Sequence, residues 1–268
     1  MDTRHPSGRS MITNCFAFAT IMAENEDLCR GLIERVLGIE IECLDVVSVE
    51  ADVPQITRRA VSCDVLARGA KTAFEVEMQV GTVKDLPRRA RYIASLVDAR
   101  VLAKGEPTHR LPDLFVIFIC MYDPFERGLP RYTTRRCMAE DATVACENGV
   151  TEVYVNATGD LRKASPELAA LCRYFVTCDT SSGDPFVAQM DGILERRLED
   201  EEWRSEVLTL DQYLALERGE GIAIGEERGM TSTLERLVEA GLLTPAQAQE
   251  FRASQACDNG VCAERRGA

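Results

Sequence analysis

The sequence predicts an α/β fold whose core is a helix, three strands, a second helix and a buried strand, with more helices after it. Residues 16–37 repeat apolar side chains at helical spacing, and residues 61–80 hold two short strand patterns joined by a glycine-containing link. Residues 114–121 form an uninterrupted apolar run rich in aromatic and β-branched side chains. That run is too short for a solitary buried helix, so we expect a central strand covered on both faces.

The first helix is expected over residues 16–37, with a break near residues 25–27. Asn25 is a favourable cap and the acidic Glu26 and Asp27 suit a first helical turn, so a second helix can begin there. Gly38 follows and is expected to end the helix, because glycine adopts left-handed backbone without strain. Residues 39–49 alternate loosely and predict a first strand, followed by a loop around Pro54.

Two strands at residues 61–67 and 72–80 are expected to form a hairpin, since the four residues between them include a glycine. The next helix is expected from about Pro87 to Lys104. Its inward stripe is predicted to be Tyr92, Ile93, Leu96, Val97 and Leu102.

After the buried strand the chain is less regular to about residue 149. A short strand is expected at residues 152–155 and helices from Pro166 onward. Four glycines lie among glutamates in residues 218–229, and each lowers helix stability by about 1 kcal/mol relative to alanine. This segment is expected to be a weak helix or hinge between helices at 203–216 and 234–240.

The composition places the chain among globular proteins. It has 268 residues, 46% of them hydrophobic, which suits one large domain or one domain with an appendage and excludes collagen-like and wholly disordered chains. No apolar run approaches the roughly 20 residues of a membrane-spanning helix, so no membrane partner is expected. Residues 1–11 lack the apolar stretch of a secretory signal, and we therefore expect a cytoplasmic location.

The eleven cysteines are an odd number scattered along the chain, which predicts free, mostly buried thiols rather than a disulfide framework. No CxxC pair exists, and the closest couple, Cys257 and Cys262, has four residues between its members and no histidine near it, so no structural zinc site is expected. Charge is unevenly distributed within a net charge of −13. Residues 191–239 hold fourteen acidic and six basic side chains, whereas residues 84–104 carry a net charge of +4. The acidic surface as a whole argues against non-specific polyanion binding, and a polyanion, if one binds, is expected to meet residues 84–104.

The hairpin holds the candidate chemistry. Alternation along the second strand places Glu75, Glu77 and Gln79 on one face. A four-residue link pairs Asp64 near Glu75 and diagonally near Glu77, so two or three carboxylates converge. Converging carboxylates suit a hard cation such as Mg²⁺, which could activate water and neutralise charge on a phosphodiester. The alternative is a solvated polar face of an antiparallel sheet.

These residues resemble the PD-(D/E)XK nuclease superfamily and, within it, the recombination-promoting nuclease (Rpn) and transposase family. The resemblance covers most of the chain, and it is the order and spacing of its pieces that is specific. They are residues 14–18, 26–29, 37–39, 63–65, 76–79, 86–92, 115–120, 123–125, 131–133 and 200–203, followed by the Gly- and Glu-rich tract.

The resemblance implies a restriction-endonuclease-like core and a role for each polar residue of the hairpin. Asp64 and Glu77 would bind the metal, Mg²⁺ with Mn²⁺ as an alternative. Gln79 occupies the position of the superfamily lysine and would orient water without contributing charge, which could weaken activity, and Glu75 could assist as a base. Arg88, Arg89 and Arg91 would hold DNA phosphates. A solvated helix face is the alternative for the arginines.

Two departures from the resemblance bear on activity. Asn14 stands where relatives often carry an acidic residue, and Ile93 and Ala94 replace a tyrosine and a polar residue. The expected function is thus a Mg²⁺-dependent DNA endonuclease associated with recombination or mobile elements. The alternative is a catalytically impaired relative that acts as a DNA-binding or protein-interaction module.

The expected domain organisation has four parts. Residues 1–12 form a flexible N-terminus and residues 13–180 the nuclease-like domain. Residues 181–252 form an acidic helical extension, through which the chain could form a homo-oligomer, and residues 253–268 form a disordered tail.

Overall fold

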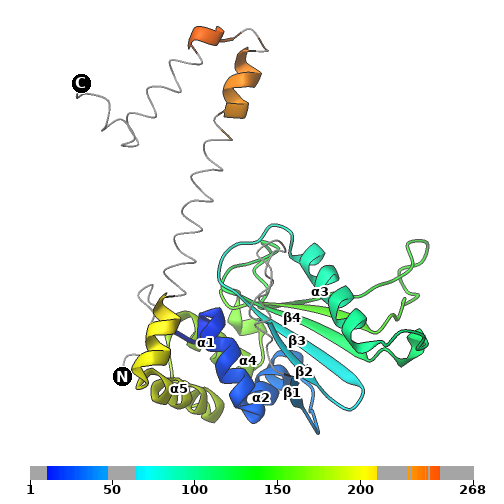
Figure 1. Ribbon diagram of the computed structural model, residues 1–268, viewed down its shortest axis with the longest axis vertical. Helices are drawn as coiled ribbons and strands as arrows, with labels where there is room; N and C mark the ends of the chain where they lie inside the picture. The colour runs from blue at the N-terminus through cyan, green and yellow to red at the C-terminus, as the bar shows by residue number, and fades with distance from the viewer. Residues whose placement is uncertain are drawn as a thin grey trace. The chain divides into compact units, whose positions relative to one another are not determined.

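The computed structural model describes residues 11–47 and 64–209, together with parts of 229–247 (Figure 1). Contacts divide the chain into two compact units, Met1–Val207 and Leu208–Ala268. The sheet and the helices labelled in Figure 1 belong to the first unit. In the second unit, residues 231–238 are helical and overlap the helix expected at 234–240, while residues 210–228 lie outside the described residues.

A six-stranded mixed sheet forms the centre of the first unit, in the spatial order β1-β2-β3-β4-β6-β5. The strands are β1 (Asp45–Val47), β2 (Asp64–Arg68), β3 (Thr72–Gln79), β4 (Asp113–Cys120), β5 (Arg131–Thr133) and β6 (Val150–Asn156). Strands β3, β4 and β6 are parallel, and the other neighbouring pairs are antiparallel. The α/β class is therefore confirmed, and β4 lies between two parallel neighbours, as its continuous apolar run predicts.

Two helices precede the sheet, α1 (Cys15–Glu24) and α2 (Glu26–Leu37), so the break expected near Asn25 is confirmed. Asn14 caps α1, because its side-chain oxygen accepts hydrogen bonds from the backbone N–H groups of Phe16 and Ala17. Gly38 ends α2 with φ 73°, the left-handed conformation that favours glycine.

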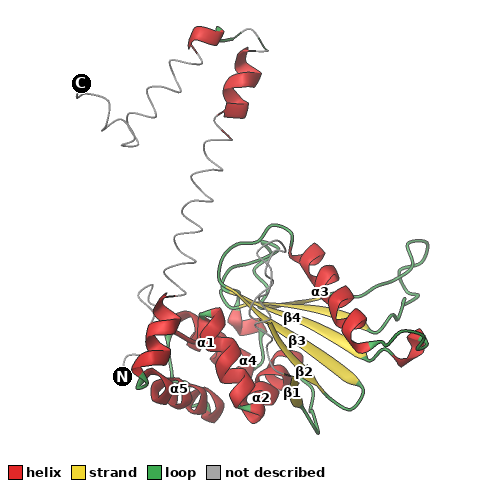
Figure 2. Cartoon of the chain, in the orientation of Figure 1, coloured by secondary structure: helices red, strands yellow, loops and turns green. Residues whose placement is uncertain are grey.

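Helix α3 (Leu86–Val101) lies on one face of the sheet, whereas α1 and α2 lie on the other (Figures 1 and 2). The core beneath α3 contains Ala90, Ile93 and Val97 from the helix and Val116 and Phe118 from β4. Tyr92 was expected in this inward stripe, but its side chain is 52% exposed. The prediction is wrong because Ala90, Ile93, Ala94 and Val97 already supply the apolar stripe, and Tyr92 lies outside it.

Helices α4 (Pro166–Thr177) and α5 (Pro185–Leu198) and the helical residues 201–209 follow β6. Arg35 of α2 binds Asp184 at the start of α5 with a distance of 2.9 Å between nitrogen and oxygen. The ring centres of Trp203 and Phe16 are 6.4 Å apart. Residues 181–207, assigned from the sequence to an extension, thus contact the first two helices within one unit. The short helix η1 (Met11–Thr13) precedes α1, η2 (Thr108–Arg110) lies between α3 and β4, and η3 (Leu161–Lys163) lies between β6 and α4.

The structure also bears on the expectations about membrane-spanning helices and about cysteines. None of the helices in the described ranges is both long enough and apolar enough to span a bilayer. Cysteines in those ranges are free, as expected, but only Cys29, Cys120 and Cys172 are buried, so "mostly buried" is wrong. Of the exposed ones, Cys137 and Cys146 lie in the irregular segment between β5 and β6, where no packed element covers them.

Candidate functional site

The polar face of β3 is covered by helix α3 rather than solvated. Glu75, Glu77 and Gln79 are 4%, 2% and 7% exposed, and they pair across the sheet with Val116, Phe118 and Cys120 of β4. Val116 and Phe118 belong to the core beneath α3, so the β3 carboxylates lie on that same covered face. A solvated sheet face is therefore the wrong explanation for these residues, and buried carboxylates require partners.

The hairpin register differs from the expected one by two residues. Asp64 pairs directly with Glu77, and Leu66 takes the place opposite Glu75. The N–H of Gly69 donates to the carbonyl of Thr72 over 2.7 Å, so the ladder continues further than expected and the turn is tighter. Because side chains alternate with a period of two, this shift keeps residues 64 and 77 on one face and brings them opposite one another.

Glu77 is held by two neighbours from different elements. Gln79 donates from Nε2 to its Oε1 over 2.6 Å, and Arg89 of α3 donates from Nε to its Oε2 over 3.0 Å. The Arg89 Nη2 group also donates to Oε1, which makes a bidentate pair. The Glu77 side chain is 3% exposed and that of Arg89 is 30% exposed, so the pair spans the boundary between core and solvent.

This arrangement changes the picture of Arg89, which the sequence suggested as a phosphate contact. Its guanidinium neutralises the buried carboxylate of Glu77. Arg88 and Arg91 are exposed, and neither forms an ion pair with any residue that the structure describes. Of the three arginines, Arg89 thus contacts the buried Glu77, whereas Arg88 and Arg91 are exposed to solvent.

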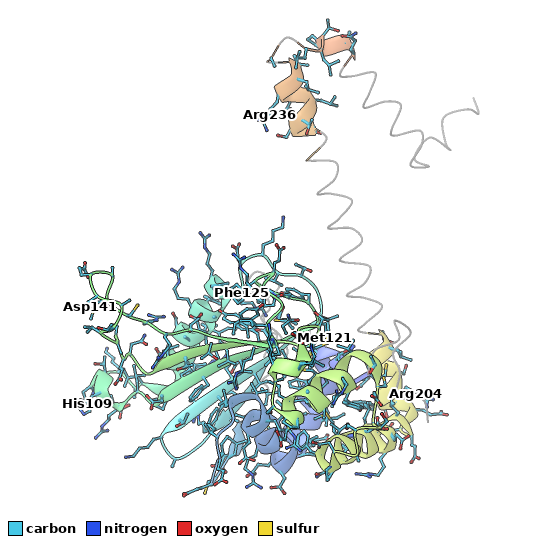
Figure 3. All side chains as sticks on the ribbon, turned by 180° about the vertical axis from the view of Figure 1, so that it is seen from behind. His109, Met121, Phe125, Asp141, Arg204 and Arg236 are labelled. Carbon is cyan, nitrogen blue, oxygen red and sulfur yellow. The ribbon has the colours of Figure 1, made fainter. Side chains whose placement is uncertain are left out.

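The site lies toward the carboxyl ends of the parallel strands. Met121 follows β4 at this end, and its N–H donates to the carbonyl of Gln79 over 2.9 Å. Figure 3 shows Met121 and His109 at opposite ends of β4. In open α/β sheets ligands bind at the carboxyl ends of strands, so the placement of Glu77 and Gln79 suits a ligand site.

Tyr122 and Cys120 join this end of the site, and sequence reasoning missed both. The N–H of Val83 donates to the Tyr122 hydroxyl over 3.0 Å, which ties the loop between β3 and α3 to the end of β4. Burial raises the pKa of Tyr122 to about 12, and burial together with the negative charge of Glu77 raises the pKa of Cys120 to about 12. Burial therefore favours the protonated form of the Cys120 thiol.

The donor atoms suit a hard divalent cation. Asp64 and Glu77 offer carboxylates at paired positions and Gln79 offers an amide oxygen, all of them ligands that Mg²⁺ accepts. The structure describes the backbone of Asp64 but not its side chain, and within the described residues no group of three or more His, Cys, Asp or Glu could hold a metal. The fit of these residues to the cation therefore rests on the chemistry of the donor atoms and on the strand register alone.

Asn14 lies away from these strands in its described contacts. Besides capping α1, its Nδ2 donates to the carbonyl of Val207 over 3.4 Å, and only 6% of the residue is exposed. This amide therefore links α1 to the helical residues 201–209, a role that a carboxylate could not fill as donor.

Comparisons of the whole chain with models of protein families, with curated proteins and with solved structures find no match.

Proposed function

We propose that this chain is a metal-dependent DNA endonuclease with a restriction-endonuclease-like core, related to the recombination-promoting nuclease and transposase family. The observation that carries the proposal is the direct pairing of Asp64 with Glu77 on adjoining strands, with Gln79 two residues further on the same face. The motif order of the sequence and the element order α2-β1-β2-β3-α3-β4 support it.

Each residue then has a distinct task. Asp64 and Glu77 hold the cation, which supplies an activated water and neutralises charge on the phosphodiester. The Gln79 amide can orient water through a hydrogen bond, although it contributes no positive charge. Glu75 is a buried carboxylate on the same strand face and is the candidate base. Arg88 and Arg91 place the phosphate backbone.

The proposal is tested by incubating supercoiled plasmid with purified protein and Mg²⁺. The unaltered chain is expected to nick the plasmid, and Asp64→Asn, which keeps the side-chain size, should reduce the rate at least 100-fold because one metal ligand loses its charge. Asp113→Asn is the matched control, since Asp113 is exposed at the amino end of β4. Equal nicking by the Asp64 variant and the unaltered chain would contradict the proposal.

A second function is favoured by the Arg89–Glu77 pair. A guanidinium that already neutralises Glu77 competes with any cation for the same two oxygens. A chain in which Arg89 keeps this position would bind nucleic acid or a protein partner without hydrolysis, as the neutral Gln79 also suggests.

The proposal has three further parts. The partner is DNA, the chain self-associates through its C-terminal helices, and its location is cytoplasmic.

Metal titration separates the two functions. If Glu77 binds the cation, Mn²⁺ should raise the thermal midpoint with concentration, because a ligand that binds only the folded state stabilises it. Arg89→Gln should then raise the affinity for Mn²⁺ roughly 10-fold or more, since the cation no longer displaces a charge-assisted pair. No stabilisation of either protein by Mn²⁺ would favour the binding module.

A further inference from the structure

The outer face of α3 carries an exposed aromatic ring among cations. Arg88, Tyr92 and Ser95 follow one another at spacings of four and three residues, so they lie on one stripe, with Arg91 beside it. All four are exposed, and the opposite side of the helix packs on the sheet. The Tyr92 ring is therefore presented to solvent beside two exposed arginines.

The charge of this face contrasts with the rest of the chain. Residues 86–97 contain three arginines and no acidic residue, in a protein with a net charge of −13. Arg89 is turned to Glu77, whereas Arg88 and Arg91 pair with no carboxylate in the described ranges. The Ser95 hydroxyl donates to the carbonyl of Arg91 over 2.9 Å. Each of these two guanidinium groups can contact a phosphate, so this face suits a polyanion that carries successive phosphates along its chain.

The exposed Tyr92 ring favours single-stranded over double-stranded nucleic acid as the ligand of this face. In a duplex the faces of the bases are stacked on one another, so a protein that tracks its phosphates leaves an exposed ring without a partner. A single strand presents base faces, and stacking on an aromatic side chain is tolerant of sequence because every base has a π face. Arginines for phosphates and a tyrosine for a base together form the pattern of single-strand binding.

We propose that the outer face of α3 binds single-stranded nucleic acid, with Arg88 and Arg91 on the phosphates and the Tyr92 ring stacked on a base. This inference rests on the proposed function and names its substrate class as unpaired or locally opened strands. Arg88 and Arg91 flank Arg89, the residue that contacts Glu77, so a strand on this face lies within one helical turn of the pair at the candidate site.

Fluorescence anisotropy in EDTA tests binding without cleavage. The probes are labelled 12-nucleotide oligomers of deoxythymidine and of uridine, and a mixed-sequence duplex of 12 base pairs. The unaltered protein is expected to bind one or both single strands at least 10-fold more tightly than the duplex. Tyr92→Leu should weaken single-strand binding roughly 10-fold, whereas Tyr92→Phe should retain it, because stacking needs the ring and not the hydroxyl.

The arginine variants separate phosphate contacts from stacking. Arg88→Gln and Arg91→Gln should each reduce affinity and the steepness of its salt dependence. Arg173→Gln, an exposed arginine of α4, removes the same charge elsewhere and should change neither. Duplex binding as tight as single-strand binding, no binding of any oligomer, or a Tyr92→Leu variant with unchanged affinity would overturn the inference.

The outcome is distinguishable from that of the nuclease proposal. Single-strand binding that depends on Tyr92, without nicking in Mg²⁺, would retain the binding face and reject hydrolysis. Nicking that depends on Asp64, with no preference for single strands, would retain hydrolysis and reject the binding face.

Discussion

Arg89 and Glu77 form the contact on which the candidate site depends. A carboxylate with 3% exposure would be unfavourable alone, and the bidentate guanidinium supplies both charge and hydrogen bonds. The pair also joins β3 to the covering helix α3, so it serves folding and the site at once. Breaking such a pair from one side leaves a buried charge without compensation.

Arg89→Ala is therefore expected to lower the free energy of unfolding by about 3 kcal/mol, the low end of the range for buried pairs because Arg89 is partly exposed. Urea denaturation measures it. In a Glu77→Gln background the same change should cost much less, since no charge is then left unpaired, and the double-mutant cycle isolates the pair. Equal costs in both backgrounds would show that Arg89 acts through packing alone.

At the scale of an element, α5 is fixed to the fold by its first residues. The Asp184 side chain accepts hydrogen bonds from the N–H groups of Phe186 and Val187, and it also binds Arg35 of α2. The Arg35 guanidinium lies 4.3 Å from the centre of the Phe186 ring. One carboxylate thus caps α5 and connects it to α2.

Asp184→Ala should lower the free energy of unfolding by about 2 kcal/mol at pH 7, through the lost cap and the lost partner of Arg35. Burial raises the pKa of Asp184, but the bonds from Arg35, Val187 and Phe186 outweigh it and hold the pKa below its usual range. The contribution is therefore full above the ordinary aspartate pKa of about 4 and lost as pH falls through the lower folded-state pKa.

Urea denaturation of the alanine variant and the unaltered protein between pH 7 and pH 3 checks the sign, because the difference between them should shrink toward acid. Asp184→Asn keeps an acceptor for the cap and should cost about 1 kcal/mol, only part of the alanine effect. A difference that grows toward acid would contradict the assigned pKa direction.

At the scale of the molecule, contacts place the end of the first compact unit at Val207, so this unit includes α5. Trp203 and Val207 are buried. Six apolar side chains of α5 are buried as well: Phe186, Val187, Met190, Ile193, Leu194 and Leu198. The buried stripe of α5 is not evident from composition, because charged residues dominate the average over residues 181–252.

A chain that ends at residue 209 should keep its thermal midpoint within about 3 °C of the full chain, since a change below 1 kcal/mol shifts a domain of this size by that amount. A chain that ends at residue 180 should not fold, because the α5 side chains contribute on the order of 10 kcal/mol, comparable to the whole stability of a domain.

Circular dichroism follows both truncations, and the single tryptophan, Trp203, reports unfolding of the longer one by fluorescence. A cooperative transition in the chain of 180 residues at the midpoint of the full chain would place α5 outside the folding unit.

Local patterns determined much of the fold. The break at Asn25, the stop at Gly38 and the central position of β4 follow from capping, backbone freedom and a continuous apolar run, all of which act within a few residues. Strand β5 was missed because three residues carry no readable period. The prediction that Tyr92 is buried was wrong, because nothing in the neighbouring sequence distinguishes an exposed aromatic residue from the buried apolar residues next to it.

The sequence by itself determined that acidic residues share one face of β3, since alternation along a strand is a property of the backbone. Only the tertiary structure decided which acid stands opposite Asp64, because the turn at Gly69 sets the register, and which arginine enters the core to meet Glu77. Three arginines within four positions look alike along the chain. The packing of α3 on the sheet, a long-range interaction, turns one of them inward and leaves two to solvent.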